Sequence, residues 1–111
     1  MKAYLLTAVA TFALTLNAGI ASWYGEELRG HLTANGELFN PDKLTCASWH
    51  YKFGTKLKVT NLASGKSVVV ICNDRGPNKR LKREIDLSHG AFKRIANPKV
   101  GLIEVKVERV K

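Results

Sequence analysis

The fold follows from residues 67–77, which read Ser67-Val68-Val69-Val70-Ile71-Cys72-Asn73-Asp74-Arg75-Gly76-Pro77. The first six residues are mostly apolar and β-branched, a pattern that is typical of a strand buried on both faces. Residues 73–77 then break the strand abruptly, because glycine and proline interrupt regular structure. We therefore expect a central strand that ends in a polar loop containing Asp74.

The segments around this strand continue the β pattern. Residues 57–60 alternate apolar and polar side chains, and turn-forming residues separate them from residue 67, so the two strands are predicted to form a hairpin. Residues 26–43 contain turn and breaker signals, and we expect a long irregular loop there that carries function. Further short strands are predicted at residues 19–25, 84–87 and 102–108.

One helix is predicted, over residues 89–96. Ser88 is the expected N-cap, and Asn97-Pro98 ends the helix. Its expected apolar face consists of Ala91, Phe92 and Ile95. About six short strands and one helix predict a mainly β domain, a small closed or nearly closed barrel.

The chain begins with the pattern of a secretory signal peptide. Met1-Lys2 precedes a charge-free apolar run that is shorter than the roughly 20 residues needed to span a bilayer. We predict a signal peptide over residues 1–18, cleaved after Ala18 or, as a second candidate, after Ala21. Residues 19–111 then form a single domain. An uncleaved anchor and a buried N-terminal helix are the alternatives.

The same region predicts where the protein works. No cysteine stands beside the small residues at positions 17–19, so a lipid-modified N-terminus and hence a membrane anchor are not expected. We expect an exported protein, periplasmic or secreted, and a monomer.

The charge balance favours an anionic partner. Eighteen basic and nine acidic residues give a net charge of +9, and the predicted signal peptide contributes only Lys2. Such a charge suits nucleic acid, membrane headgroups or an acidic polysaccharide, and export makes the polysaccharide the most natural of the three. No nucleic-acid-binding motif is present, so no nucleic-acid partner is expected.

Two cysteines, Cys46 and Cys72, lie in the predicted domain. In an oxidising compartment they form a disulfide or remain as two buried free thiols, and the pairing slightly favours the disulfide. No histidine stands at metal-ligand spacing from them, so neither a zinc site nor another metal or cofactor is predicted.

Polar groups concentrate in two loops, at residues 33–40 and 73–77. A carboxylate at the end of a rigid, buried strand is held in place and partly desolvated, which suits Asp74 to act as a general acid. Glu37 supplies a second carboxylate if the fold brings the loops together, and paired carboxyl groups are the usual equipment for cleaving glycosidic bonds. The alternatives are that Asp74 only accepts backbone N–H bonds in a turn and that Glu37 is solvated.

Aromatic and basic residues extend this pattern. Trp23-Tyr24 and Trp49-His50-Tyr51 offer flat faces that stack on sugar rings, although at least one tryptophan is expected in the core. Arg75 and the basic residues within 79–83 are suited to steering an anionic polymer, or form a solvated face.

Several motifs occur in a fixed order along residues 19–110. They are Ala21-Ser22-Trp23-Tyr24-Gly25, Thr33-Ala34-Asn35-Gly36-Glu37, Phe53-Gly54-Thr55, Val59-Thr60-Asn61-Leu62, Gly65-Lys66-Ser67-Val68-Val69-Val70, Asn73-Asp74-Arg75-Gly76-Pro77 and Ile85-Asp86-Leu87-Ser88. This series resembles the rare lipoprotein A family of double-psi β-barrel proteins, which are related in fold to expansins.

The resemblance implies a six-stranded double-psi β-barrel whose groove binds peptidoglycan. It implies an endolytic lytic transglycosylase that cleaves MurNAc–GlcNAc linkages of peptide-free glycan and leaves 1,6-anhydro-MurNAc ends. The alternative is a non-catalytic, expansin-like module that binds the polysaccharide and loosens the wall.

The resemblance also implies roles for individual residues. Asp74 matches the family's central catalytic aspartate, and Glu37 matches an acidic groove residue. Asn40 and Ser48 stand where active members often have aspartate and histidine, and His50 is a candidate substitute because alternate residues of a strand share a face. The substrate-binding residues expected beside the two carboxylates are Trp23, Tyr24, Asn35, Asn40, Ser48, His50 and Arg75.

Overall fold

The computed structural model describes residues 18–111, and the signal-peptide prediction, apart from Ala18, lies outside the described residues. Six strands follow in order: β1 (Ala18–Tyr24), β2 (Thr45–Ala47), β3 (Lys56–Asn61), β4 (Ser67–Asp74), β5 (Ile85–Ser88) and β6 (Ile103–Arg109). The helix α2 (His89–Ile95) follows β5, and short 3-10 turns span Glu26–Leu28, Lys79–Leu81 and Pro98–Val100. The expected strands and helix are therefore confirmed, and β2 joins them as a strand of three residues.

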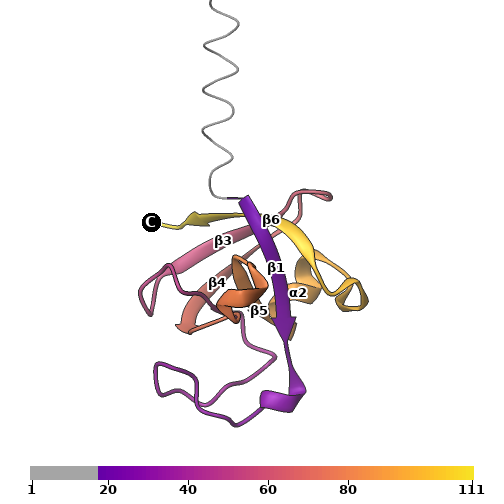
Figure 1. The fold of residues 1–111 in the computed structure, drawn as a ribbon. Helices are drawn as coiled ribbons and strands as arrows, with labels where there is room; N and C mark the ends of the chain where they lie inside the picture. Colours follow the sequence, from indigo (N-terminus) through magenta and orange to yellow (C-terminus); the bar gives the residue numbers. More distant parts are fainter. Residues whose placement is uncertain (1–17) are drawn as a thin grey trace, which may run out of the picture.

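The strands close into a barrel in the order β1-β5-β2-β4-β3-β6 (Figure 1). Two pairs are parallel, β1 with β5 and β2 with β4, and the remaining four are antiparallel. The predicted hairpin is present as β3 and β4, joined by a tight turn. The prediction of a six-stranded mainly β barrel with one short helix is confirmed.

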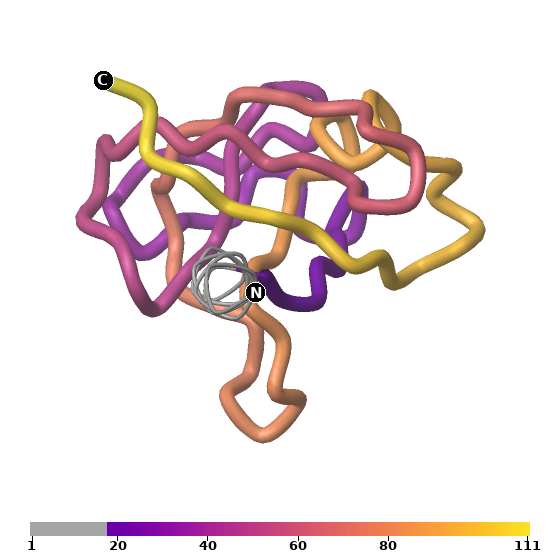
Figure 2. The backbone as a smooth tube through the Cα atoms, turned by 90° about the horizontal axis from the view of Figure 1, so that it is seen from above, coloured from indigo at the N-terminus to yellow at the C-terminus, as the bar shows by residue number. Residues whose placement is uncertain are grey.

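Two connections pass over a neighbouring strand, and they position the candidate site. The loop from β1 to β2 passes β5, because β1 and β2 both pair with β5. The loop from β4 to β5 passes β2, because β4 and β5 both pair with β2. Figure 2 follows these crossings along the backbone. Residues far apart in sequence, in the 30s and the 70s, are thereby brought to the same side of the barrel.

The core lies inside the barrel and beneath α2. Alternate residues of the strands point inward and are almost completely buried, among them Leu57, Val59, Val70, Ile85 and Val105. The predicted apolar face of α2 is confirmed, since Ala91, Phe92 and Ile95 are buried in this same core. Burial of apolar surface of this kind is the main stabilising contribution to such a domain.

The expectation that β4 is covered on both faces was wrong, and of the two alternatives for the cysteines the structure has the free thiols. The outward-facing side chains of Val69 and Ile71 are 44% and 42% exposed, so β4 is covered on one face only. Cys46 and Cys72 face each other on β2 and β4, but both are buried free thiols. An apolar, β-branched run does not distinguish a strand with two covered faces from one whose outer face is bare.

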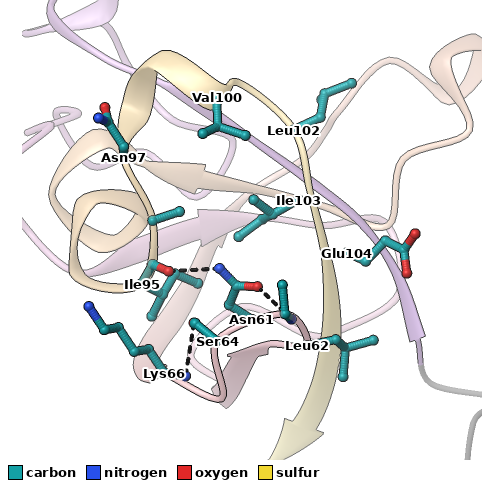
Figure 3. Close-up of a pocket in the computed structure, with 12 residues that line it drawn as sticks. Asn61, Leu62, Ser64, Lys66, Ile95, Asn97, Val100, Leu102, Ile103 and Glu104 are labelled. Carbon is teal, nitrogen blue, oxygen red and sulfur yellow. Dashed lines mark hydrogen bonds between the residues drawn. The ribbon is translucent and has the colours of Figure 1, made fainter.

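A wide hollow of about 790 Å³ lies between the β3–β4 turn, the end of α2 and the start of β6 (Figure 3). Apolar side chains such as Leu62, Val100 and Leu102 form much of its lining, and Glu104 is its single carboxylate. It lacks the paired carboxyl groups that glycosidic chemistry needs. Within residues 18–111, no helix is long and apolar enough to cross a membrane.

Ser88 couples the helix to the long loop. Its hydroxyl accepts a hydrogen bond from the amide of Ala91, as an N-cap does, and donates one to the carbonyl of Lys43. We predict that Ser88→Ala lowers the free energy of unfolding by about 1–2 kcal/mol, because both bonds are lost in a buried place. Chemical denaturation measures the change. Ser67→Ala, at an exposed strand start, is the control and should stay within about 0.5 kcal/mol of wild type.

Candidate active site

The site is built on a row of four residues that runs across the barrel. Ser22 on β1 pairs with Asp86 on β5, Asp86 pairs with Ala47 on β2, and Ala47 pairs with Asp74 at the end of β4. Ser22, Asp86 and Ala47 alternate with the inward-facing core residues of their strands. On β4 the register shifts between Cys72 and Asp74, an irregularity that leaves Asn73 without a partner on β2 and brings Asp74 beside Ala47. Two carboxyl groups therefore flank the small side chain of Ala47, with their backbones about 10 Å apart.

Asp74 ends β4, as predicted, and is held by backbone amides. Its Oδ1 accepts hydrogen bonds from the amide of Ala34 at 2.9 Å and from the amide of Arg75 at 2.8 Å. Within residues 18–111 no donor bonds to Oδ2. The turn-stabilising role considered for this aspartate is thus real, and it leaves one carboxylate oxygen for other partners.

Asp86 is the second carboxyl group of the row, and the sequence analysis did not select it. The hydroxyl of Ser22 donates a hydrogen bond to its Oδ1 at 2.8 Å. Burial raises the pKa of Asp86 above its usual range, the charge of Asp74 raises it further, and Ser22 and Arg83 oppose the shift. A raised pKa is what keeps the proton on a carboxylic acid that must donate it. The sequence feature that could have identified Asp86 is its position between two apolar strand residues, Ile85 and Leu87.

An apolar cluster packs beside the two carboxyl groups. Tyr24, Phe39 and Ala47 form it, and the rings of Tyr24 and Phe39 stack with their centroids 4.5 Å apart. Burial, followed by the charges of Asp74 and Asp86, raises the pKa of the Tyr24 hydroxyl. That hydroxyl has no hydrogen-bond partner among the described residues. Tyr24 therefore supports the site from beneath rather than offering an open face to a sugar.

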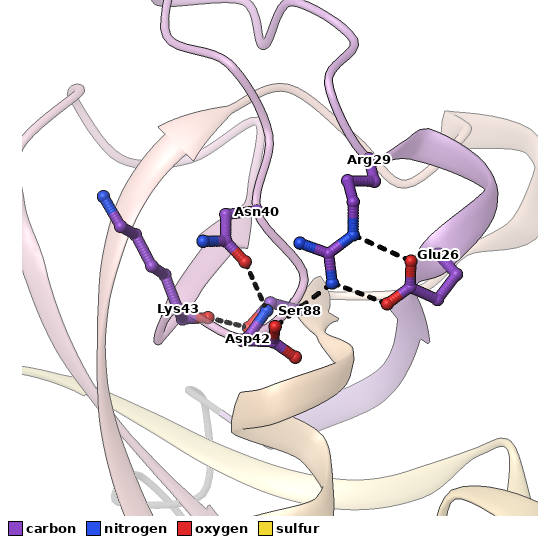
Figure 4. Close-up of polar contacts among 6 residues, drawn as sticks. All are labelled: Glu26, Arg29, Asn40, Asp42, Lys43 and Ser88. Atoms are coloured by element: carbon purple, nitrogen blue, oxygen red, sulfur yellow. Dashed lines mark hydrogen bonds and ion pairs between the residues drawn. The ribbon is translucent and has the colours of Figure 1, made fainter.

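The long loop over this cluster is tied down at its base (Figure 4). Arg29 contacts Glu26 and reaches Asp42 at 3.1 Å, and the amide of Asp42 bonds to the side chain of Asn40. The backbone of Gly90 donates to the carbonyl of Pro41 at 2.7 Å. These contacts join the loop to itself and to α2, so its tip is presented to Asp74 in a defined position.

The loop tip carries Glu37 and Asn35. The side-chain amide of Asn35 donates to the carboxylate of Glu37, and the backbone amide of Asn35 bonds to the carbonyl of Asn73. Glu37 is exposed, which agrees with the alternative that its carboxylate is solvated. It nevertheless belongs to the loop that contacts the end of β4. The fold thus brings the two predicted loops together.

A hollow of about 420 Å³ runs along this loop. Glu37 and Asn40 line it, together with Asn73, whose buried Oδ1 has no hydrogen-bond partner among the described residues. No residue of the row of carboxyl groups lines this hollow, and Asn73, the chain neighbour of Asp74, is what connects the two. A buried acceptor without a partner among the described residues is open to a donor such as a hydroxyl group.

Three of the expected substrate-binding residues lie elsewhere or are covered. Trp23 packs against His89 and Phe92 of α2, and its Nε1 donates to the carbonyl of Pro98 at 2.9 Å. It is partly buried against the core, as expected of at least one tryptophan, and its ring is engaged by α2. Tyr24 is covered by Phe39, as described above. Ser48 is completely buried and accepts a hydrogen bond from the amide of His50.

The structure places His50 outside strand β2. Strand β2 ends at Ala47, so the rule that alternate strand residues share a face does not reach Ser48 and His50. His50 is exposed, and its Nε2 lies 3.8 Å from the carboxylate of Glu84. The prediction that it shares a face with Ser48 was wrong because the chain bends there.

Arg75 and Trp49 frame the other side of the site. Arg75 donates to the carbonyl of Ser48 at 3.0 Å and lies over the ring of Phe53, 3.9 Å from its centroid. It joins the end of β4 to the segment after β2. Trp49 is 45% exposed and is the tryptophan that remains available to a flat ligand. Residues 18–111 contain no cluster of three or more side chains suited to a metal ion.

Comparisons with known proteins agree on one family. A family model described as lytic transglycolase matches residues 16–107. The chain is 50% identical over 95 residues to a probable endolytic peptidoglycan transglycosylase RlpA of Synechocystis sp., covering 86% of this chain and 29% of that protein. It is 43% identical over 91 residues to the endolytic peptidoglycan transglycosylase RlpA of Vibrio cholerae, covering 82% of this chain and 34% of that protein.

A solved structure with the same fold is an expansin of Clavibacter michiganensis in complex with cellohexaose. The TM-score is 0.66 at 22% identity, over 86% of this chain and 50% of that chain. At this identity the likeness concerns the fold. The chain spans about a third of the length of the two curated relatives, 29% and 34%.

The raised pKa of Asp86 makes a prediction about stability. Its ionised form is disfavoured in the fold, so the folded protein loses stability as pH rises from the ordinary aspartate value of 3.8 through the raised one. We expect Asp86→Asn to raise Tm at pH 7 by a few degrees and to have little effect below pH 3.8, where both states keep the proton. Thermal unfolding across this pH range measures the difference.

Glu108→Gln, a half-exposed carboxylate on β6, is the control and should change Tm little at any pH. If Asp86→Asn lowers Tm at pH 7 as much as at acid pH, then burial of the charge is not a cost to the fold.

Proposed function

The chain belongs to the lytic transglycolase family of double-psi β-barrel domains, and on that premise we propose that it is an endolytic lytic transglycosylase of peptidoglycan. The family match and the high identity to the two RlpA proteins support this proposal. We further propose that it cleaves MurNAc–GlcNAc linkages of peptide-free glycan and leaves 1,6-anhydro-MurNAc ends.

The observation that carries the proposal is the pair of carboxyl groups, Asp74 and Asp86, on either side of Ala47. The two groups have different surroundings: Asp74 is anchored by two backbone amides, whereas Asp86 is buried and has a raised pKa. Pairs of carboxyl groups in unlike environments divide the roles of acid and base.

We assign the proton donor to Asp86, because burial raises its pKa above the usual aspartate range and so favours the protonated form that a donor needs. It gives that proton to the bridging oxygen while the bond from this oxygen to C1 of MurNAc breaks. The C6 hydroxyl oxygen of the same sugar then bonds to C1, and its proton passes to the free Oδ2 of Asp74. No water enters the products. The Asp74 carboxylate also stabilises the positive charge that develops on the sugar ring.

We propose that the glycan lies along the hollow beside the long loop. Asn73 and Asn40 are placed to bond sugar hydroxyl groups, and Glu37 with Asn35 borders the same path. Trp49 is an exposed aromatic side chain at the Arg75 end of the site, where its Nε1 donates to the carbonyl of Pro77. The net charge of +9 suits a glycan whose lactyl groups are carboxylates. A glycan substrate also places the protein outside the cytoplasm, which is where the N-terminal pattern predicts it.

A second candidate function rests on Ser48. This residue stands where active relatives often have histidine, and it is buried and engaged by the backbone. If catalysis requires that histidine, the domain is a module that binds peptidoglycan without cleaving it. The two functions differ in whether new glycan ends appear.

The test is mass spectrometry of denuded and intact peptidoglycan incubated with the protein and its variants. We expect new 1,6-anhydro-MurNAc ends from the wild type, and at least a hundredfold slower release with Asp74→Asn or Asp86→Asn, because proton transfer by such groups contributes about 10²- to 10⁴-fold. We also expect the rate to fall as pH rises through the raised pKa of Asp86, since the donor must carry its proton.

Glu108→Gln is again the matched control and should keep the wild-type rate, because it lies on the far side of the barrel. Wild-type protein that retains denuded glycan in a pull-down yet releases no new ends would establish the binding module. Unchanged release by Asp86→Asn, with Asp74→Asn inactive, would overturn the assignment of the proton donor.

A further inference from the structure

The connection from β4 to β5 stands out from the barrel. Figure 2 shows it projecting beyond the rest of the backbone, in orange. Asn78 caps its 3-10 turn by accepting a hydrogen bond from the amide of Arg80, and the amide of Leu81 bonds back to the carbonyl of Asn78. At its base, Nε1 of Trp49 donates to the carbonyl of Pro77 at 2.7 Å. We name residues 78–83 the basic hairpin. These hydrogen bonds give the projecting segment a defined conformation.

Its charge is concentrated and uncompensated. Six residues contain four cations, Lys79, Arg80, Lys82 and Arg83. None of the four forms an ion pair with a carboxylate of residues 18–111. Lys79 lies over the ring of Trp49, and Arg83 acts on Asp86 only through its charge. Unpaired cations on a projecting turn attract an anionic surface.

An apolar residue occupies the middle of this charge. Leu81 is 50% exposed, and together with Ile20 and Leu102 it lines a shallow hollow of about 390 Å³ at the side of the hairpin. Arg83, Ile103 and Glu104 complete the lining. Leu102 is itself 46% exposed. The surface thus consists of exposed leucines next to a cluster of cations.

We propose that the basic hairpin binds the surface of an anionic phospholipid bilayer. Lys and Arg head groups pair with lipid phosphates, while the exposed leucine side chains enter the boundary between head groups and acyl chains. The hairpin borders the proposed site through Arg83 and Lys79, but the inference uses neither carboxyl group, so it goes beyond the proposed function and does not rest on it.

Two observations favour a bilayer over a glycan strand as the partner. Sugar rings are recognised by flat aromatic faces and hydrogen-bonding groups, whereas the side chain at the centre of this cluster is an aliphatic leucine. The hairpin also projects from the body of the molecule, as contact with an extended surface requires, rather than lining a hollow that encloses a single strand. Apolar residues flanked by cations are the pattern of interfacial membrane binding.

The test is co-sedimentation of the full chain with vesicles of phosphatidylcholine alone or of phosphatidylcholine with phosphatidylglycerol. We expect binding to the anionic vesicles that weakens with salt, and little binding to the neutral ones. The triple variant Lys79→Glu, Arg80→Glu and Lys82→Glu should bind anionic vesicles at least tenfold more weakly, because each basic residue near such a surface strengthens binding by about fivefold. Leu81→Ser, which keeps the charge, should bind severalfold more weakly.

The matched control is Lys56→Glu, Lys58→Glu and Lys93→Glu, which makes the same change in net charge at exposed positions of β3 and α2. It should bind much more strongly than the hairpin variant. Equal losses in the two triple variants would mean that net charge alone drives binding, and would overturn the proposal. So would a hairpin variant that binds vesicles like the wild type and loses only denuded glycan. Residues 1–17 are mostly apolar and common to all variants, so neutral vesicles measure their contribution, and the hairpin is tested by the difference between variants on anionic vesicles.

Discussion

The arrangement of the site depends on hydrogen bonding along both edges of strand β2. This strand is only three residues long, and it pairs in parallel with β4 and antiparallel with β5. Its last residue, Ala47, consequently sets the positions of Asp74 and Asp86 at once. Its methyl group is also close to the next loop, since a Cβ added at Gly76 would lie 3.5 Å from the Cβ of Ala47. A small side chain at this place lets both the carboxyl pair and the crossing loop approach.

The crossing loops then give the two carboxyl groups unlike surroundings. The tip of the long loop donates an amide to Asp74, while Ser22 supplies one hydroxyl to Asp86. Burying an ionised carboxylate is costly, and a buried group avoids part of that cost by keeping its proton. The pKa of Asp86 is raised because the group is buried and lies near the negative charge of Asp74. The same burial that disfavours its ionised form in the folded protein is what suits it to the proposed role of proton donor.

A strand or helix could be predicted from the sequence where its residue pattern is long enough to show a period. Strand β3 and helix α2 repeat their patterns over six or seven residues and have clear turn or cap residues, and both were predicted. Strand β2 is too short to show a period, so neither its existence nor the end at Ala47 was visible. The pairing that aligns Asp86 with Asp74 is a matter of register between distant strands, which local patterns do not encode. The two tryptophans were likewise indistinguishable until α2 was seen to cover Trp23.

The position of Ser48 explains how a departure from the family's pattern is compatible with an intact carboxyl pair. Ser48 comes directly after Ala47, where the chain has left β2, and its hydroxyl holds the amide of His50 while its carbonyl accepts from Arg75. It therefore shapes the segment beside the row without belonging to it. Asp74 and Asp86 take their positions from β-sheet register and from backbone amides, which a substitution at Ser48 leaves in place. The groups that the proposed proton transfers need are thus held by the barrel itself, and a substitution at Ser48 acts first on the conformation of the neighbouring segment.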